Sequence, residues 1–188
     1  MADLNQISRQ LDELLAQADL TTTTSEGQGR AELPDGYYLC EVEKAELGAS
    51  SNGNPMVTIK FKVVEDGFKT VVDEAGNDTL VPAANTKGNT IYQNYTLTNN
   101  MNLGFFVSDM LKFEDPATPG KPLLADTPEE AKAFFTNTEL LLDALDIISM
   151  GSRIYVMLQT KPRKDNPDVT DKKKSLISWK RAEYLGLL

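Results

Sequence analysis

Positively charged and aromatic side chains gather in the last fifth of the chain, residues 151–188. This segment holds nine Lys and Arg residues against four Asp and Glu, a net charge of +5, whereas the whole chain of 188 residues has a net charge of −9. Ammonium and guanidinium groups neutralise phosphates, and flat rings stack on unpaired bases. The combination is typical of a surface that binds a nucleic-acid strand. The alternative interpretation is an ordinary hairpin whose charges keep it soluble.

The pattern within this segment predicts two strands, 153–159 and 176–181, on either side of a basic loop over 161–174. A flexible basic loop can close over a bound strand, although a solvated loop explains the composition almost as well. The candidate cations of the segment are Arg153, Lys161, Arg163, Lys172, Lys173, Lys174, Lys180 and Arg181.

Two aromatic residues of this segment are candidates for base stacking. Tyr155 lies between two aliphatic residues that form the better core face, so we expect its ring on the exposed face, beside Arg153. Trp179 is the only tryptophan, and both faces of its predicted strand are mixed. A lone tryptophan is more often part of a core than a platform, so its place stays open between these two.

Two earlier strands carry further candidates. In residues 56–64, apolar side chains alternate with Lys60 and Lys62, which we expect to line a groove on the opposite face. In residues 90–97, Tyr92 lies on the polar face, where its ring can stack on a base. The alternative for all three is a solvated strand face without a ligand.

The elements that must position these residues are mainly strands, with helices between them. The earlier strands are predicted at 37–47, 56–64 and 90–97, and the helices at 99–113, 127–135 and 138–150. Residues 68–88 show neither the two-residue period of a strand nor the 3.6-residue period of a helix. They predict a long excursion from the sheet, which can contain a small hairpin. Three strands, a helical region and two strands predict a five-stranded antiparallel barrel of the OB type, with a helical insertion between strands 3 and 4.

The N-terminal segment, residues 1–29, is predicted to be separate from the barrel domain, residues 30–188. Leucine and other apolar residues recur at three- and four-residue steps over 3–18, which predicts an amphipathic helix. A Thr-, Ser- and Gly-rich linker follows at 21–29. The helix can pack on its own domain or mediate self-association with a second copy.

The composition excludes several classes of enzyme. The chain has no histidine, which removes His-based acid–base catalysis, Ser/His/Asp triads and most zinc sites. No phosphate-binding glycine motif is present, and the acidic stretch 73–78 lacks the ligand spacing of a calcium loop. We therefore expect a protein that is not an enzyme and has neither a cofactor nor a metal site. Cys40 is the only cysteine, and no apolar run is long enough to span a membrane, so we expect a cytoplasmic protein.

Several segments resemble one family of phage proteins. They are Leu33–Tyr38 (LPDGYY), Val42–Glu46 (VEKAE), Ser51–Phe61 (SNGNPMVTIKF), Ile91–Leu97 (IYQNYTL) and Ser178–Tyr184 (SWKRAEY). Over about residues 33–184 the chain resembles phage single-stranded-DNA-binding proteins with an OB fold. The resemblance implies binding of single-stranded DNA without sequence preference, in DNA replication or recombination, together with replication or recombination proteins. Many proteins of this function end in an acidic tail, and the final residues here have no acidic cluster, so recruitment through such a tail is not expected.

Two other functions fit the same sequence. An acidic barrel with a helical arm suits a structural or assembly protein of the virion. An adaptor that binds a host protein is the third hypothesis. Binding of single-stranded DNA is the leading one because it explains the basic segment, the strand order and the resemblance together.

Overall fold

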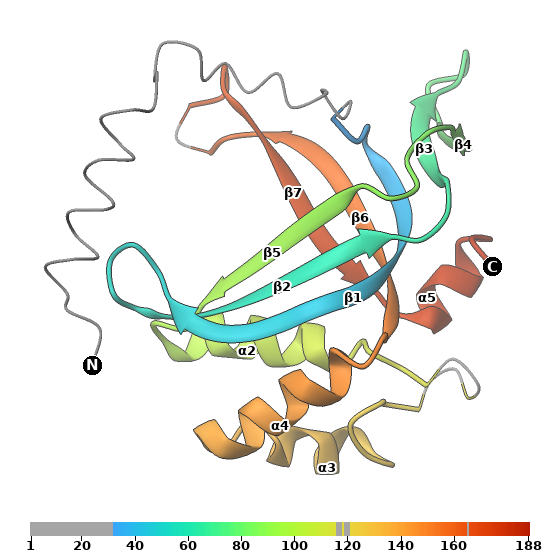
Figure 1. Ribbon diagram of the computed structural model, residues 1–188. Helices are drawn as coiled ribbons and strands as arrows, with labels where there is room; N and C mark the ends of the chain where they lie inside the picture. Colours follow the sequence, from blue (N-terminus) through green and yellow to red (C-terminus); the bar gives the residue numbers. More distant parts are fainter. Residues whose placement is uncertain (1–31, 116–117, 119–120, 165) are drawn as a thin grey trace, which may run out of the picture. The chain divides into compact units, whose positions relative to one another are not determined.

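Seven antiparallel strands form one open sheet in the part of the chain that the structure describes, residues 32–188 without 116–117, 119–120 and 165 (Figure 1). The structure is a computed structural model. The strands are β1 (Gly36–Ala49), β2 (Pro55–Val63), β3 (Gly67–Val72), β4 (Asp78–Ala83), β5 (Thr90–Thr96), β6 (Arg153–Pro162) and β7 (Thr170–Ile177). The predicted N-terminal helix and its linker lie outside the described residues.

The long first strand organises the sheet. Its second half pairs with β2, its first half pairs with β6, and its first two residues also pair with β3. The sheet continues outward as β2–β5, β3–β4 and β6–β7. No ladder joins β5 to β7 among the described residues, so the sheet is not a closed barrel. The predicted excursion over 68–88 contains the β3–β4 hairpin, which raises the number of strands from the expected five to seven.

A bulge in β1 interrupts its pairing with β2. The register shifts between Val42 and Lys44, so that Glu43 is an extra residue opposite the ladder. Its side chain lies on the outer face, where Lys60 and Lys62 of β2 also project. The alternate residues of β2, among them Ile59 and Phe61, are fully buried. The period of two therefore sorts β2 into a core face and a charged face, as its sequence predicts.

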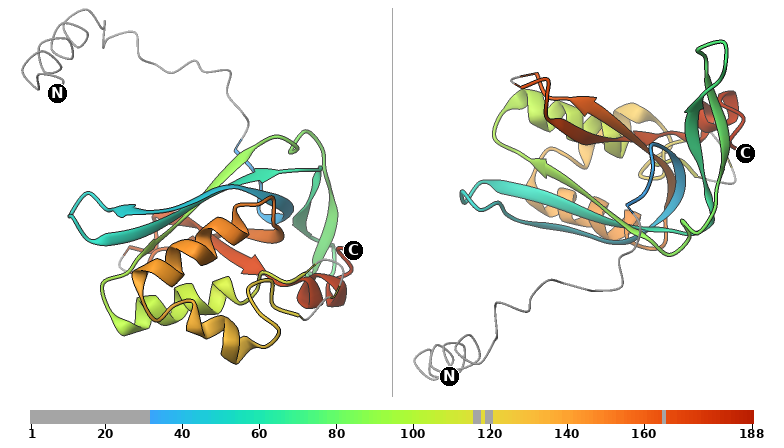
Figure 2. Two further views of the ribbon diagram at one scale, coloured as in Figure 1. Left: turned by 60° about the horizontal axis from the view of Figure 1, so that its bottom comes forward. Right: turned by 90° about the horizontal axis from the view of Figure 1, so that it is seen from above.

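Helices fill the connection between β5 and β6 and lie on one side of the sheet (Figure 2). They are α2 (Asn100–Met110), α3 (Pro128–Ala133) and α4 (Thr138–Ile148), and they confirm the three predicted helices within a few residues. Each begins at a capping side chain, Asn99, Thr127 or Asn137, which accepts a backbone N–H of the first turn. None of the described helices is long and apolar enough to cross a membrane.

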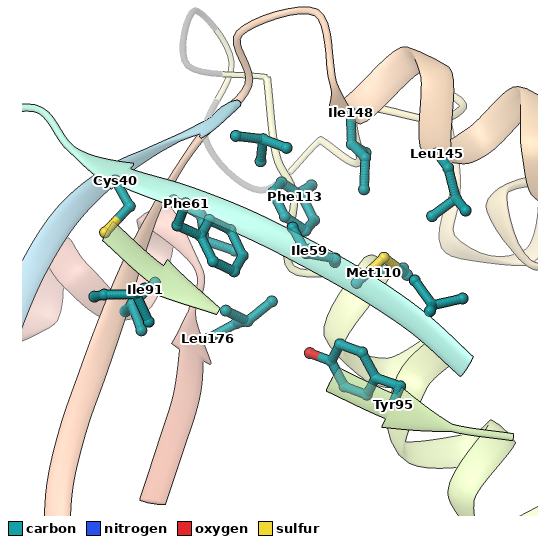
Figure 3. Close-up of a cluster of buried hydrophobic side chains, with 14 of the residues drawn as sticks. Cys40, Ile59, Phe61, Ile91, Tyr95, Met110, Phe113, Leu145, Ile148 and Leu176 are labelled. Atoms are coloured by element: carbon teal, nitrogen blue, oxygen red, sulfur yellow. The ribbon is translucent and has the colours of Figure 1, made fainter. Parts of the chain in front are cut away.

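The main core lies between the sheet and these helices. Phe61 and Ile91 from the sheet meet Met110 and Phe113 from the α2 region and Ile148 from α4 (Figure 3). All five are buried, and they come from two strands and two helical segments. Burial of such side chains contributes about 1.5–3 kcal/mol each, which fixes the sheet and helices as one unit.

The end of the chain differs from the sequence prediction. Residues 172–174 belong to β7 and pair with residues 158–160 of β6, so they are not in a loop. Strand β7 ends at Ile177, and Ser178 caps a short helix, α5 (Trp179–Tyr184), by accepting the Arg181 N–H. The prediction of a strand over 176–181 is therefore wrong from Ser178 onward. The serine cap is the local reason that the chain turns into a helix there.

Candidate nucleic-acid interface

The outer face of β2 and β5 brings three predicted binding residues together. Lys60 lies directly opposite Tyr92 in the register of the two strands, and Lys62 lies two residues further along β2. The Tyr92 side chain is 50 % exposed. We call the surface of Lys60, Lys62 and Tyr92 the lysine–tyrosine face. It presents two ammonium groups and one flat ring, the groups that track phosphates and stack on bases.

One carboxylate is paired with both lysines of this face. The Lys60 Nζ lies 2.8 Å from one carboxylate oxygen of Glu43, and the Lys62 Nζ lies 3.9 Å from the other. The hydrogen bond from Lys60 lowers the pKa of Glu43, and the same bond raises the pKa of Lys60. Both groups are therefore charged at neutral pH. The face carries a net positive charge, and its lysines are held close to one another.

Lys174 reaches the edge of the lysine–tyrosine face from the far end of the sequence and from the inner face of the sheet, because it lies opposite the buried Leu158. It projects from β7, and its Nζ donates a hydrogen bond of 2.6 Å to the backbone carbonyl oxygen of Tyr92 on β5. Partial burial of the ammonium group lowers the pKa of Lys174. This bond crosses the open seam, by which we mean the space between the unpaired edges of β5 and β7. The basic segment thus contributes one cation to the same region as Tyr92.

The other cations of the β6–β7 hairpin do not form one basic patch. Lys161 and Lys173 lie on the opposite face of the hairpin from Lys174, because side chains alternate along a strand. Asp171 lies among them, 3.0 Å from the Arg163 Nε and 3.8 Å from the Lys173 Nζ. The basic loop predicted over 161–174 is shorter than expected, because residues 161–162 belong to β6 and residues 170–174 to β7. On the inner face, the Lys172 ammonium donates to the Leu33 carbonyl oxygen.

Three further predicted cations lie at the start of β6 and on α5. The Arg153 Nε lies 3.3 Å from a carboxylate oxygen of Glu41. The Arg181 guanidinium lies over the Tyr184 ring, 4.8 Å from its centre. Lys180 is exposed on the first turn of α5. Glu41 lies opposite Lys62 on one side and opposite Arg153 on the other, so Arg153 is on the same outer face as Lys62, with a carboxylate between the two cations.

Tyr155 is buried, which corrects the expectation of an exposed ring. Its side chain is only 3 % exposed, and its hydroxyl donates a 2.7 Å hydrogen bond to the Leu187 carbonyl oxygen. Burial raises the pKa of this hydroxyl. The ring meets Trp179 edge-on, at 5.8 Å between ring centres. A second apolar cluster under α5, which includes Leu39 and Ala182, covers this part of the outer face. Tyr155 is not available for base stacking, and Trp179 packs as part of the same cluster.

Sequence reasoning missed a cavity at the open seam. It has a volume of about 510 Å³ and lies between β5, α2 and β7. We call it the seam pocket; its lining includes Asn94, Asn102, Phe105, Asp109, Lys112 and Lys174. Phe105 is 63 % exposed, although the adjacent Phe106 is fully buried. The helical period places Phe105 off the apolar side of α2, and this was the available signal of an exposed aromatic residue.

Comparison of the sequence with profiles of known protein families and with curated proteins finds no match. A function is therefore argued from the side chains. Within the described residues, no group of three His, Cys, Asp or Glu side chains is placed to hold a metal ion. The feature that carries chemical meaning is the lysine–tyrosine face with Lys174 at its edge. Such a surface can neutralise phosphates and stack on a base.

Proposed function

We propose that this chain is a phage protein that binds single-stranded DNA without sequence preference, in DNA replication or recombination. The observation that carries the proposal is the arrangement of Lys60, Tyr92 and Lys174. Tyr92, whose ring is exposed, lies opposite Lys60 on β2, and its backbone carbonyl accepts the hydrogen bond from Lys174 on β7. Flat side chains near cations suit a single strand of nucleic acid, whose bases and phosphates are both accessible.

The order and pairing of the strands support the proposal. Strands β5, β2, β1, β6 and β7 are neighbours in that order in the open sheet. We interpret this order as that of an OB-like barrel, with β3 and β4 as an added hairpin. The OB fold is a partly open barrel, and the face of its second and third strands binds oligonucleotides. Those two strands correspond to β2 and β5, which carry the lysine–tyrosine face. The resemblance of several segments to phage single-stranded-DNA-binding proteins points to the same function.

The number of cations sets the expected salt dependence. Each phosphate contact to a single strand contributes about 0.7 to the slope of log K against log salt. Three contacts, from Lys60, Lys62 and Lys174, give a slope of roughly −2. Stacking on Tyr92 adds about 1–3 kcal/mol that salt does not screen.

The test is a titration of a labelled oligo-dT by fluorescence anisotropy at several salt concentrations. Replacing both Lys60 and Lys62 by Gln should reduce the slope by about 1.4, because two phosphate contacts are lost. The matched control is Lys69→Gln, which removes one exposed charge from β3, away from this face. No binding by the unaltered protein at low salt would refute the proposed function. An unchanged slope in the double variant would remove the lysine–tyrosine face from the site.

A further inference from the structure

The geometry points to a base-binding subsite in the seam pocket, in which Phe105 stacks on one base of the DNA strand that crosses the lysine–tyrosine face. This inference rests on the proposed function, since it concerns the same ligand. It adds a residue and a place that neither the sequence pattern nor the OB-like strand order indicates. The seam pocket begins where the lysine–tyrosine face ends, at the free edge of β5.

The size and position of the pocket suit a base. Its volume of about 510 Å³ lies within the range of about 300–1,000 Å³ in which small ligands bind. The Phe105 ring is largely exposed while it lines this cavity. A phenyl ring stacks on the face of any base, so it adds affinity without sequence preference.

The polar lining of the pocket fits a base and its flanking phosphates. The Lys112 Nζ lies 2.6 Å from one carboxylate oxygen of Asp109, and the Tyr95 hydroxyl donates a 2.8 Å hydrogen bond to the other. These bonds hold one wall of the pocket in place. Asn94 and Asn102 contribute amide groups, each with donors and an acceptor, which can bond to the edge of any base.

Lys174 connects the pocket to the lysine–tyrosine face. It lines the cavity, and its ammonium group donates to the Tyr92 carbonyl oxygen at the edge of that face. A DNA phosphate at this place is an anionic acceptor, and it makes a stronger hydrogen bond with an ammonium group than a neutral carbonyl does. A phosphate of the bound DNA strand can therefore replace the Tyr92 carbonyl as the hydrogen-bond acceptor of Lys174, at the point where the DNA passes from β5 into the seam.

An exposed aromatic residue on a helix also suits a protein partner, and Met101, one turn before Phe105 on α2, is exposed too. The lining has two lysines and three amide side chains against one carboxylate, that of Asp109, and this polar surface with a net positive charge favours the nucleic acid. An apolar peptide would leave these polar groups without partners, which is costly when they are covered.

The experiment compares Phe105→Leu with Tyr184→Leu, which removes an exposed ring from α5. Thermal denaturation first checks that both variants fold, as expected for exposed positions. In the oligo-dT titration, Phe105→Leu should weaken binding roughly 5- to 150-fold, the range for one stacked base, with an unchanged salt slope. Tyr184→Leu should bind like the unaltered protein. An oligonucleotide that carries 2-aminopurine should lose fluorescence on binding to the unaltered protein and less on binding to Phe105→Leu.

The outcomes separate the two proposals. If the unaltered protein binds with a slope that depends on Lys60 and Lys62, but Phe105→Leu binds as tightly as Tyr184→Leu, the base subsite is refuted and the proposed function stands. That result would make the exposed side of α2 a protein-docking surface instead. If the unaltered protein does not bind at all, both the function and the subsite are refuted.

Discussion

The hydroxyl group of Tyr155 ties the end of the chain to the sheet, and its removal should reduce stability. Tyr155→Phe deletes the 2.7 Å hydrogen bond to the Leu187 carbonyl oxygen and leaves the ring in place. A net loss of about 0.5–1.5 kcal/mol in the free energy of unfolding is expected for one such bond. Tyr155→Leu also deletes the edge-on contact with Trp179, which adds about 0.5–1.5 kcal/mol for an aromatic pair.

The assay is urea denaturation followed by the fluorescence of Trp179, the only tryptophan, which contacts the altered ring. The midpoint should shift while the slope m stays the same, because the folded surface is unchanged. In thermal denaturation, Tyr155→Phe should lower the melting temperature by about 2–4 °C for each kcal/mol. Tyr184→Phe is the control, since this ring is largely exposed and its hydroxyl makes no hydrogen bond within the described residues.

The same variants separate a structural tyrosine from a DNA-binding one. A buried ring makes no contact with DNA, so folded Tyr155→Leu should bind oligo-dT as tightly as the unaltered protein. A loss of roughly 5- to 150-fold in affinity, the range for a stacked base, would show that the ring contacts DNA. Either that loss or an unchanged stability of Tyr155→Phe would refute the reasoning.

Three further predictions follow from buried contacts and surface charge. A Cβ at Gly67 would lie 2.4 Å from the Tyr38 ring, so Gly67→Ala should lower the free energy of unfolding by about 1–3 kcal/mol in urea denaturation. Gly48→Ala is the control, because Gly48 has open space around it and the substitution should leave the free energy of unfolding nearly unchanged. Burial raises the pKa of the Cys40 thiol above its ordinary value of 9.0. The folded state then keeps a proton that the unfolded state releases, so stability should fall as the pH rises from 9 to 10, by up to about 1.4 kcal/mol per pH unit for this group. Cys40→Ala should remove this contribution, and an equally steep pH profile in the variant would contradict the assignment. Glu43→Gln frees two lysines from their shared carboxylate, so affinity for oligo-dT in the anisotropy titration should rise about two- to fivefold; an unchanged affinity would count against the site.

Local patterns predicted the parts of the fold whose strands and helices have one buried face. Strand β2 and the helix that begins after Thr127 follow their sequence signals, because alternation and capping act between near neighbours. The pattern failed at Tyr155, where α5 covers the second face of the sheet and both faces are buried. A period of two cannot distinguish a core face from a covered outer face.

The candidate site was predicted only in part for a related reason. Lys60 and Tyr92 were each assigned to the polar face of a strand, and the pairing of β2 with β5 places them opposite each other. The contact of Lys174 with the Tyr92 carbonyl joins residues 82 positions apart, and no local pattern contains that information. Phe105 lies off the apolar side of α2, and the helical period identifies only the residues that pack into the core.

The bulge that places Glu43 between two lysines has a consequence for the choice of ligand. The carboxylate acts as a built-in competitor, which a ligand must replace at both ammonium groups. A small monovalent anion that displaces the Glu43 carboxylate exchanges one negative charge for another, so it gains little binding free energy. A polymer with regularly spaced charges engages several cations at once, so the contacts after the first are intramolecular and add avidity. Under the proposed function, this one extra residue in β1 should make the face prefer a continuous polyanion to free anions.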